Sequence, residues 1–215
     1  MRISLAERGT PGWRESAAMV SMVFAESFGA EVSPDPDLFI RYIEHDATGR
    51  EEIQACAGIS YPENGEVFLE QYLDAPVEEI LSAHAGEFVD RRDILQVSSI
   101  ASVRPSAGME LIQAFPLVFA CLGRPYAAMT MTGRLAAVMQ RVGVVLHPVC
   151  QADGSRLPAA ELARWGRYYA TRPVVGYGHI SEQTDLLLRG VGRYVLDALD
   201  IRLVPSQREE LAHAA

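Results

Sequence analysis

The chain has 215 residues, nearly half of them hydrophobic, and a formal net charge of −9 at pH 7. This length and composition predict one globular domain with an elaboration, or at most two small domains, around a true hydrophobic core. All 19 basic residues are arginine, which excludes a catalytic lysine or a lysine Schiff base. The acidic balance argues against nucleic-acid binding, which requires a basic excess.

The three cysteines, Cys56, Cys121 and Cys150, lack the spacing of metal ligands. An odd number of scattered cysteines is typical of reduced, buried thiols in a cytoplasmic protein, so no metal site is expected. Charged residues near the N-terminus interrupt it before an apolar run forms, and no signal peptide is predicted. The longest apolar segment, Leu111 to Leu122, is too short to span a bilayer. We therefore predict a cytoplasmic protein without a membrane span.

The first part of the chain predicts a strand, two helices and a hairpin. Ile3 to Ala6 is a possible opening strand, and apolar residues at helical spacing predict a helix from Gly12 to Phe28. A linker interrupted by prolines precedes a possible short helix, Leu38 to Glu44. Asn64-Gly65 is a strong hairpin signal, so we expect a strand on either side of it, Ile53 to Tyr61 and Glu66 to Tyr72.

The central part of the chain alternates between strands and helices. An extended β-branched run, Ile94 to Val103, enters an Arg-Pro-Ser-Ala-Gly loop and then an apolar helix. A strand that leads into a Gly-containing loop at a helix N-terminus is typical of sites that hold anionic groups. The other elements expected here are a helix at Pro76 to Ala83, the apolar helix at Ala107 to Leu122, a strand at Tyr126 to Thr132, a helix at Gly133 to Arg141 and a strand at Val144 to Val149.

The C-terminal part predicts two more helices around an extended or irregular segment, Arg172 to Ile180. The helices are expected at Ala159 to Tyr169 and Glu182 to Leu199, and the tail after Pro205 is expected to fray. Residues 1–180 would then form one domain on which residues 181–215 pack, with the last helix in the core or at a homodimer interface. This order of elements predicts an α/β fold with a mixed, mainly antiparallel sheet and helices on both faces.

The same order, with a phosphate-loop-like segment between the fourth strand and the third helix, resembles the GNAT acyltransferase superfamily. In that fold the fourth strand bulges and splays from the fifth, and an acyl thioester lies in the V-shaped gap. The resemblance implies that Ile94 to Val103 is the fourth strand, Arg104 to Gly108 the loop, and Tyr126 to Thr132 the fifth strand.

A closer resemblance covers about residues 55–180. Four blocks are similar to the thermostable hemolysin family: FLEQYLDAPVEEIL (68–81), ILQVSSIAS (94–102), MTMTGRLAAVMQRVGVVLHPV (129–149) and WGRYYATRPVVGYGHI (165–180). That family is related in fold to GNAT enzymes and acyl-homoserine-lactone synthases. The resemblance implies transfer of an acyl group from acyl-coenzyme A or an acyl-carrier-protein thioester to a small-molecule amine.

Two departures from the family pattern bear on the chemistry. Relatives place Glu where this chain has Gln96, and the hemolysin-like motif continues Gly-Asn-Leu where this chain has Ser98-Ser99-Ile100. Glutamine orients a partner through hydrogen bonds but is not a base. The phosphate loop matches only at Arg104 and Gly108, which predicts a weak grip on pyrophosphate. This favours a carrier-protein donor, whose acidic surface would need a patch of arginines.

Glu70 is the favoured base, because strand alternation would place it beside Tyr72 on one face, where burial would raise its pKa. The alternative is a solvated strand residue. Gln96 and Ser98 share a face of the fourth strand and could hold the acceptor or a water molecule. The resemblance implies that backbone amides near Ser99, Ile100 and Ala101 form the oxyanion hole. The N–H groups of Ser106, Ala107 and Gly108, with the charge of Arg104, would hold the donor's phosphates.

Thr130 and Thr132 are expected to line the acyl path. The resemblance places Trp165, Tyr168 and Tyr169 near the acceptor, where a tyrosine hydroxyl could protonate the departing thiolate, although such an aromatic stripe is also common in cores. His179 is a substrate-binding candidate with a structural role as the alternative. A different function stays open: a catalytically inactive GNAT scaffold that acts as a binding or membrane-perturbing protein, as Gln96 could suggest.

Overall fold

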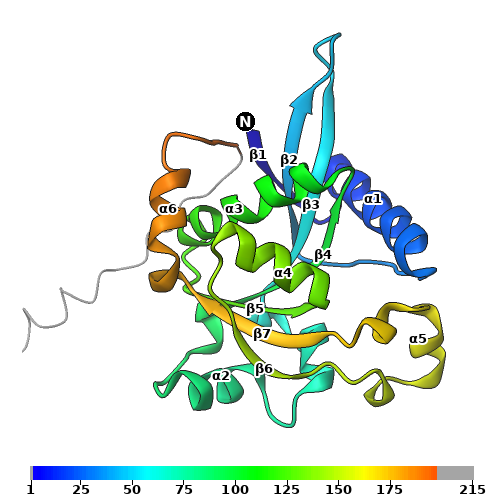
Figure 1. Cartoon of the computed structure of the whole chain (residues 1–215), viewed down its shortest axis with the longest axis vertical. Coiled ribbons are helices and arrows are strands. Elements are labelled where there is room, and N and C mark those ends of the chain that lie inside the picture. The colour runs from blue at the N-terminus through cyan, green and yellow to red at the C-terminus, as the bar shows by residue number, and fades with distance from the viewer. Residues whose placement is uncertain (1, 198–215) are drawn as a thin grey trace, which may run out of the picture.

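The computed structural model describes residues 2–197. Its centre is an eight-stranded sheet with the strand order β6-β7-β5-β4-β3-β2-β1-β8 (Figure 1). The β4–β5 and β1–β8 pairs are parallel and the others are antiparallel, which confirms the predicted mixed, mainly antiparallel sheet. The strands are β1 (Arg2–Glu7), β2 (Leu38–His45), β3 (Glu51–Ser60), β4 (Ile94–Ser102), β5 (Tyr126–Met131), β6 (His147–Gln151), β7 (Val174–His179) and β8 (Val195–Asp197).

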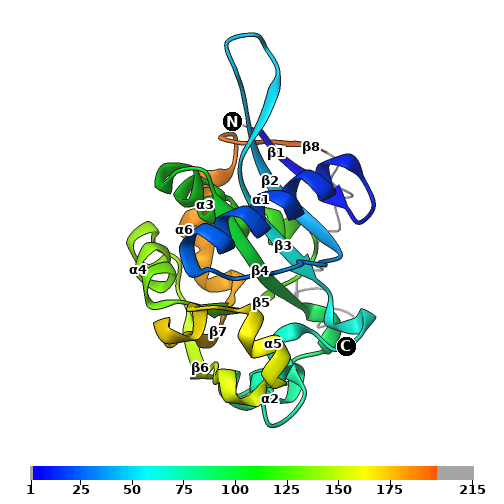
Figure 2. The ribbon, with the colours of Figure 1, turned by 90° about the vertical axis from the view of Figure 1, so that its right-hand side faces the viewer.

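Helices cover both faces of this sheet. In the view of Figure 1, α1 and α5 lie to the right of the sheet and α6 lies to the left, and Figure 2 shows α1 crossing in front of the strands. Among residues 2–197, no helix has the length and apolar character needed to cross a membrane. The helices are α1 (Pro11–Phe28), α2 (Val77–Ala85), α3 (Pro105–Cys121), α4 (Gly133–Val142), α5 (Ala159–Arg164) and α6 (Thr184–Gly190).

Alternating residues of β4 point into different apolar clusters, as expected for a strand covered on both faces. Leu95 and Val97 pack with α3 in the largest cluster. On the opposite face the packing is divided: Ile94 belongs to a cluster with α2, and Ala101 belongs to one with α1. The polar residues Gln96 and Ser98 lie between them on this face. The interruption of apolar packing there marks the place where a cavity forms.

Two predicted elements in the first part of the chain are wrong. Leu38 to Glu44 is not a helix, because it forms β2 between β1 and β3 and is buried on both sides. Glu66 to Tyr72 is not a strand, because Phe68–Tyr72 forms a 3₁₀ helix. The Glu70 carboxylate accepts a hydrogen bond from the Val67 N–H at 2.9 Å and closes this turn, so the expected hairpin is absent.

The C-terminal part differs from the prediction in its helix lengths. The helix expected from Ala159 to Tyr169 ends at Arg164 and is followed by a 3₁₀ helix, Tyr168–Thr171. The helix expected from Glu182 onward ends at Gly190, and Gly192 then turns the chain with a φ of 78° toward β8. Arg193 ties this turn to α3 through both carboxylate oxygens of Glu110. The predicted helix end at Leu199 and the tail after Pro205 lie outside the described residues.

Candidate active site

The strands β4 and β5 are paired only at their beginnings. Their ladder runs from the Ile94–Tyr126 pair to the Val97–Met129 pair. Beyond it, Ser98 is paired with β3 and Thr130 with β7, so the two strands diverge. Ser98 and Thr130 are therefore the first residues on the two sides of a V-shaped opening in the sheet, as the GNAT resemblance implies.

A bulge in β4 lies at the mouth of this opening. On β3, Cys56 pairs with Ala101 and Gly58 pairs with Ser98, so β4 has one extra residue in this interval. Ser99 takes up the distortion with a φ of 53°, a left-handed conformation that is uncommon for residues other than glycine. The bulge interrupts the alternation of side chains, and Ser98 and Ser99 both line the cavity as a result.

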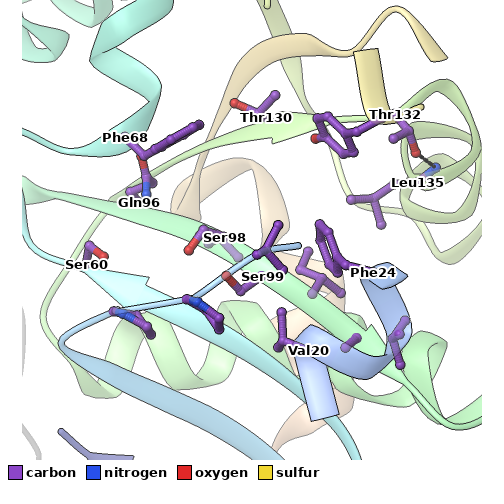
Figure 3. Close-up of a pocket in the computed structure, with 18 of the residues that line it drawn as sticks. Val20, Phe24, Ser60, Phe68, Gln96, Ser98, Ser99, Thr130, Thr132 and Leu135 are labelled. Carbon is purple, nitrogen blue, oxygen red and sulfur yellow. Dashed lines mark hydrogen bonds between the residues drawn. The ribbon is translucent and has the colours of Figure 1, made fainter. Parts of the chain in front are cut away.

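A cavity of about 1520 Å³ occupies the opening (Figure 3). It is lined from both faces of the sheet, since its walls include residues of α1 and of the 3₁₀ helix at Tyr168–Thr171 as well as residues of α3 and α4. Its aromatic wall is formed by Phe24, Phe28, Phe68, Tyr72, Trp165 and Tyr168. Its polar middle is formed by Ser60, Gln96, Ser98, Ser99 and Thr130, and its aliphatic wall by Met109, Ile112, Leu135 and Val138.

Gln96 is a cavity-lining residue whose orientation is fixed from behind. Its side chain is buried, with an exposed fraction of 4%, and its Oε1 accepts a hydrogen bond from the Leu69 N–H at 2.7 Å. With the oxygen occupied in this way, the Nε2 group remains as a hydrogen-bond donor. The residue can therefore orient a substrate but cannot remove a proton.

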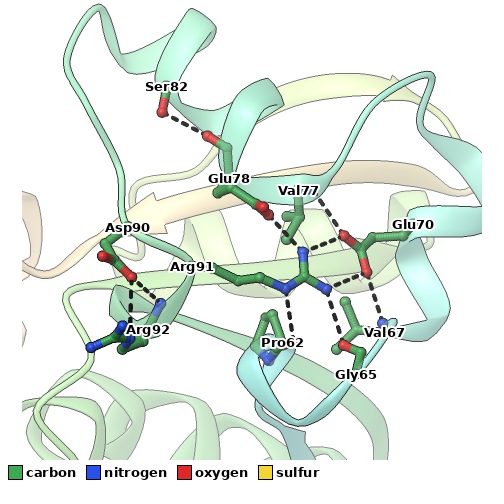
Figure 4. A network of polar contacts seen from close by, with 10 residues as sticks. All are labelled: Pro62, Gly65, Val67, Glu70, Val77, Glu78, Ser82, Asp90, Arg91 and Arg92. Atoms are coloured by element: carbon green, nitrogen blue, oxygen red, sulfur yellow. Dashed lines mark hydrogen bonds and ion pairs between the residues drawn. The ribbon is translucent and has the colours of Figure 1, made fainter.

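Glu70 does not have the environment predicted for a base. Its carboxylate accepts hydrogen bonds from Arg91 at 2.6 and 2.9 Å and from the N–H groups of Val67 and Val77 (Figure 4). Burial acts to raise the pKa of Glu70, but these donors outweigh it and hold the pKa below its usual value. The side chain is not part of the cavity wall. The expected strand position and raised pKa are both wrong.

Arg91 joins several segments beneath this part of the cavity. Besides Glu70, its guanidinium donates to the carbonyl oxygens of Pro62 and Gly65 and to Glu78 at distances of 2.6 to 3.0 Å (Figure 4). These contacts fix the 3₁₀ helix that carries the Leu69 N–H. The Glu70–Arg91 pair therefore positions Gln96 indirectly.

The tyrosines predicted near the acceptor lie at different depths. Tyr168 lines the cavity and stacks against Phe24 with ring centroids 6.2 Å apart, and burial raises the pKa of its hydroxyl. Tyr72 and Trp165 also line the cavity. The hydroxyl of Tyr169 is bonded to that of Tyr72 at 2.5 Å, and Tyr169 lies outside the cavity wall. Burial raises the pKa of Tyr169 to about 12, against the opposing effect of its bond with Tyr72.

The predicted phosphate loop offers few free donors. Pro105, the first residue of α3, has no N–H, and the N–H groups of Ala107 and Gly108 donate to the Arg104 carbonyl at 3.1 and 3.3 Å. Among the N–H groups of this loop, those of Arg104 and Ser106 are left for a ligand. The Arg104 guanidinium is paired with both oxygens of Glu44 at 2.6 and 2.8 Å. The expectation of three free amides is thus wrong for Ala107 and Gly108.

The remaining predicted residues are divided between the cavity and other places. Ile100, Ala101, Arg104, Thr130 and Thr132 line the cavity. The Thr132 hydroxyl is used as the N-cap of α4, where it accepts from the Leu135 N–H at 3.2 Å.

His179 lies away from the cavity. Its Nδ1 is 2.6 Å from the Ser181 hydroxyl oxygen, and the centroid of its ring is 4.5 Å from the centroid of the Tyr126 ring. The substrate-binding prediction for His179 is therefore not supported by its location, whereas its structural alternative is consistent with these contacts.

Several cavity residues escaped the sequence analysis. The helical spacing of Phe24 and Phe28 indicates only the apolar face of the first helix, whereas in the structure they also form a wall of the cavity. Arg134 and Arg141 also line the cavity, and their spacing of seven residues is a signal that could have placed them on one helical face. Asp37 and Ser60 carried no signal, since their approach to the cavity depends on the pairing of distant strands.

The possible metal ligands are dispersed in the described part of the chain, and one of the three thiols is fully buried. Within residues 2–197, no three His, Cys, Asp or Glu side chains are grouped closely enough to hold a metal ion. Cys56 is fully buried, and burial raises the pKa of its thiol to about 12, which makes it a poor nucleophile.

Residues 6–184 match the family described as "Thermostable hemolysin". The chain belongs to this family. No curated protein matches this thermostable hemolysin family member by sequence. Its fold is similar to that of solved acyltransferases, at identities that show the fold alone.

Three solved structures illustrate the likeness. The acyl-homoserine-lactone synthase LasI has a TM-score of 0.55 and 16% identity, over 86% of this chain and 92% of that one. BjaI, described as a coenzyme-A-dependent acyl-homoserine lactone synthase with SAM and isopentyl-CoA, has a TM-score of 0.55 and 16% identity, over 91% and 93%. FeeM, an N-acyl amino acid synthase from uncultured soil microbes, has a TM-score of 0.53 and 12% identity, over 88% and 97%.

Proposed function

We propose that this protein transfers an acyl group from a thioester, carried by coenzyme A or by an acyl carrier protein, to the amine of a small molecule. The observation that carries the proposal is the opening between β4 and β5, where a bulged strand borders a cavity lined from both faces of the sheet. LasI, BjaI and FeeM, which share the fold, are named for synthases of N-acylated products. A cytoplasmic location and a homodimer remain predictions.

The proposed reaction is an aminolysis of the thioester. The amine nitrogen forms a bond to the thioester carbonyl carbon, the C–S bond breaks, and the sulfur leaves with the bonding electron pair as a thiolate. The nitrogen loses one proton and the thiolate gains one, so the products are an amide and a thiol. The negative charge on the carbonyl oxygen in the tetrahedral intermediate needs fixed hydrogen-bond donors.

The bulge supplies candidates for these donors. Beyond Val97, the edge of β4 that faced β5 has no strand partner among the described residues, so N–H groups between Ser98 and Ala101 are available to the carbonyl oxygen. Tyr168 lines the cavity with a hydroxyl that stays protonated at neutral pH, and we assign it a hydrogen bond to the departing sulfur. Gln96 Nε2 is assigned to the acceptor.

The proton on the amine needs another route, because Gln96 is not a base. Glu70 is held by Arg91 outside the cavity wall, and no histidine among the described residues lines the cavity. The carboxylates that line it belong to Glu31, Asp35, Asp37, Glu66 and Glu161, none of which lies on β4 or β5 at the opening. We therefore propose that the amine reacts in its uncharged form after losing its proton to water. The rate should then rise with pH toward the pKa of the acceptor amine itself.

The test is turnover of defined thioesters in the presence of pooled amines, with N-acyl products detected by mass spectrometry. The Ser98→Phe variant, which fills the opening, should abolish product, whereas Ser155→Phe at an exposed site outside the cavity should not. Absence of product from acyl-coenzyme A and acyl-carrier-protein panels across amines would reject the proposal.

A non-catalytic scaffold is the second candidate, and Gln96 in the place of a base is the observation that favours it. Such a protein would bind ligands or perturb membranes without turnover. Release of dye from lipid vesicles at low protein concentration, unaffected by thioesters and retained by Ser98→Phe, would support it. Turnover that Ser98→Phe abolishes would exclude it.

A further inference from the structure

The six arginines of residues 91–141 differ in their partners. Three have carboxylates at close range: Arg91 pairs with Glu70 and Glu78, Arg104 with Glu44, and Arg124 with Glu63. Arg92 lies 3.9 Å from Asp90. By contrast, Arg134 and Arg141 have no carboxylate within ion-pair distance anywhere in residues 2–197, and both line the cavity. Their charges are available to an anionic ligand.

The geometry of α4 places these two charges on the same side. Seven residues are nearly two full turns, so Arg134 and Arg141 share a face and are separated by about 10 Å along the axis. Leu135 and Val138, which lie between them in the sequence, also line the cavity, as do Met109 and Ile112 of α3. This part of the cavity is therefore an apolar passage with two arginines on its α4 side.

The start of α3, where GNAT enzymes hold the donor, is poorly equipped in this chain. Pro105 removes one donor, the Arg104 carbonyl engages two more, and Glu44 neutralises the Arg104 guanidinium. A phosphate at this position would find two free N–H groups in the loop, those of Arg104 and Ser106. Arg134 and Arg141, which have no carboxylate partners among the described residues, lie instead across the passage, on α4. Arg164 of α5 also lines the cavity without such a partner in this part of the chain, but it donates to the Glu31 carbonyl and the Ser33 hydroxyl.

Resting on the proposed function, we propose that Arg134 and Arg141 bind the phosphate of the donor's phosphopantetheine arm in place of the α3 N-terminus. Guanidinium groups form paired, charge-assisted hydrogen bonds with phosphate oxygens. The apolar passage formed by Leu135, Val138 and Ile112 suits the methyl groups of the pantetheine. The arm would then lead the thioester to the opening between Ser98 and Thr130.

The experiment compares ligands that differ in the phosphate, using calorimetry with the full-length protein. Phosphopantetheine should bind more tightly than pantetheine, and Arg134→Gln and Arg141→Gln should each reduce affinity for phosphopantetheine about tenfold, as expected for loss of one charge-assisted contact. Affinity for pantetheine should not change. Arg189→Gln, at an exposed site on α6 outside the cavity, serves as the matched control, and thermal unfolding checks that each variant folds.

The two sources of this phosphate are compared in the same variants. An equal loss for coenzyme A and for a phosphopantetheinylated carrier protein supports a site for the shared phosphate. A loss confined to the carrier protein would instead mean contact with the carrier's surface, and the inference would be wrong.

The remaining outcomes separate this inference from the proposed function. If Arg104→Gln and Ser106→Pro remove the phosphate-dependent affinity while the α4 variants keep it, the phosphate binds at α3 and the inference fails. If thioesters turn over but phosphopantetheine binds no more tightly than pantetheine, the inference fails while the proposed function stands. If neither pantetheine nor coenzyme A binds the wild-type protein, the proposed function fails as well.

Discussion

The Leu69 N–H donates a hydrogen bond to Gln96 Oε1 at 2.7 Å, and this contact couples the wall of the cavity to the Glu70–Arg91 pair behind it. Leu69 precedes Glu70 in the same 3₁₀ helix. Gln96 is thus oriented by the 3₁₀ helix Phe68–Tyr72, which the Glu70–Arg91 ion pair holds in place. The two residues have separable roles, which mutations can distinguish.

Gln96→Glu should raise activity. The carboxylate can still accept from the Leu69 N–H, and it adds a base on β4 beside the opening. We expect at least a tenfold increase in rate below the acceptor's pKa, since general bases contribute about 10²-fold or more. A new limb should appear in the pH–rate profile, because activity should fall as the pH drops through the pKa of the glutamate introduced at position 96. Burial raises that pKa above the value of an exposed glutamate. An unchanged profile would contradict a role for water as the proton acceptor.

Glu70→Gln should reduce stability and leave the chemistry intact. Loss of this partly buried ion pair should lower the free energy of unfolding by about 2 kcal/mol. Because Arg91 and two N–H donors lower the folded-state pKa of Glu70, its contribution is complete above the unfolded-state pKa and is lost as the pH falls through the folded-state pKa. The difference from wild type should therefore narrow in acid, as measured by urea denaturation. A folded variant without turnover would restore Glu70 as a catalytic base only if Gln96→Ala, which removes the side chain that the pair positions, retains turnover.

Tyr168→Phe and Tyr169→Phe form a matched pair. Among the described residues, no protein group is hydrogen-bonded to the Tyr168 hydroxyl, so its removal should lower kcat roughly tenfold with little change in stability. Tyr169→Phe breaks the bond to Tyr72 and should cost about 1 kcal/mol of stability while kcat is retained. If Tyr169→Phe lowers kcat and Tyr168→Phe does not, the departing sulfur lies beside Tyr169. Steady-state kinetics and thermal unfolding of both variants decide between these outcomes.

Substitutions at Ser99 test the bulge. Its φ of 53° is costly for a β-branched side chain, so Ser99→Val should destabilise the protein by about 2 kcal/mol and reduce activity by moving the adjacent N–H groups. Ser99→Gly should keep stability within about 1 kcal/mol of wild type. Ser60→Val in β3, which has ordinary strand geometry and also lines the cavity, is the control. Equal effects of the two valine variants would mean that the bulge is not a special backbone site.

Much of the fold was predictable where local signals agreed with tertiary structure. The elements from β4 to α4 were found because β-branched runs and helical periodicity follow one another with clear breaks at Gly123 to Pro125 and Thr132 to Gly133. Leu38 to Glu44 was misread because a short apolar run fits either a buried strand or a helix, and only its pairing with β1 and β3 decides between them.

The candidate site was less predictable, because its geometry depends on contacts that are distant in sequence. The positions of Gln96 and Ser98 followed from strand alternation, whereas the bulge at Ser99 follows from register with β3. Glu70 was misplaced because the Asn64-Gly65 signal suggested a hairpin that the Arg91 contacts replace with 3₁₀ turns. The importance of Arg134 and Arg141 emerges only when the partners of the other arginines are known.

The cavity is lined from both faces of the sheet, and this has a kinetic consequence for the proposed reaction. A donor that enters between α3 and α4 and an acceptor that enters between α1 and α5 need not displace each other. Both can be bound at once, so initial-rate plots should intersect as in a sequential mechanism. The free thiol product should compete with the donor and not with the amine.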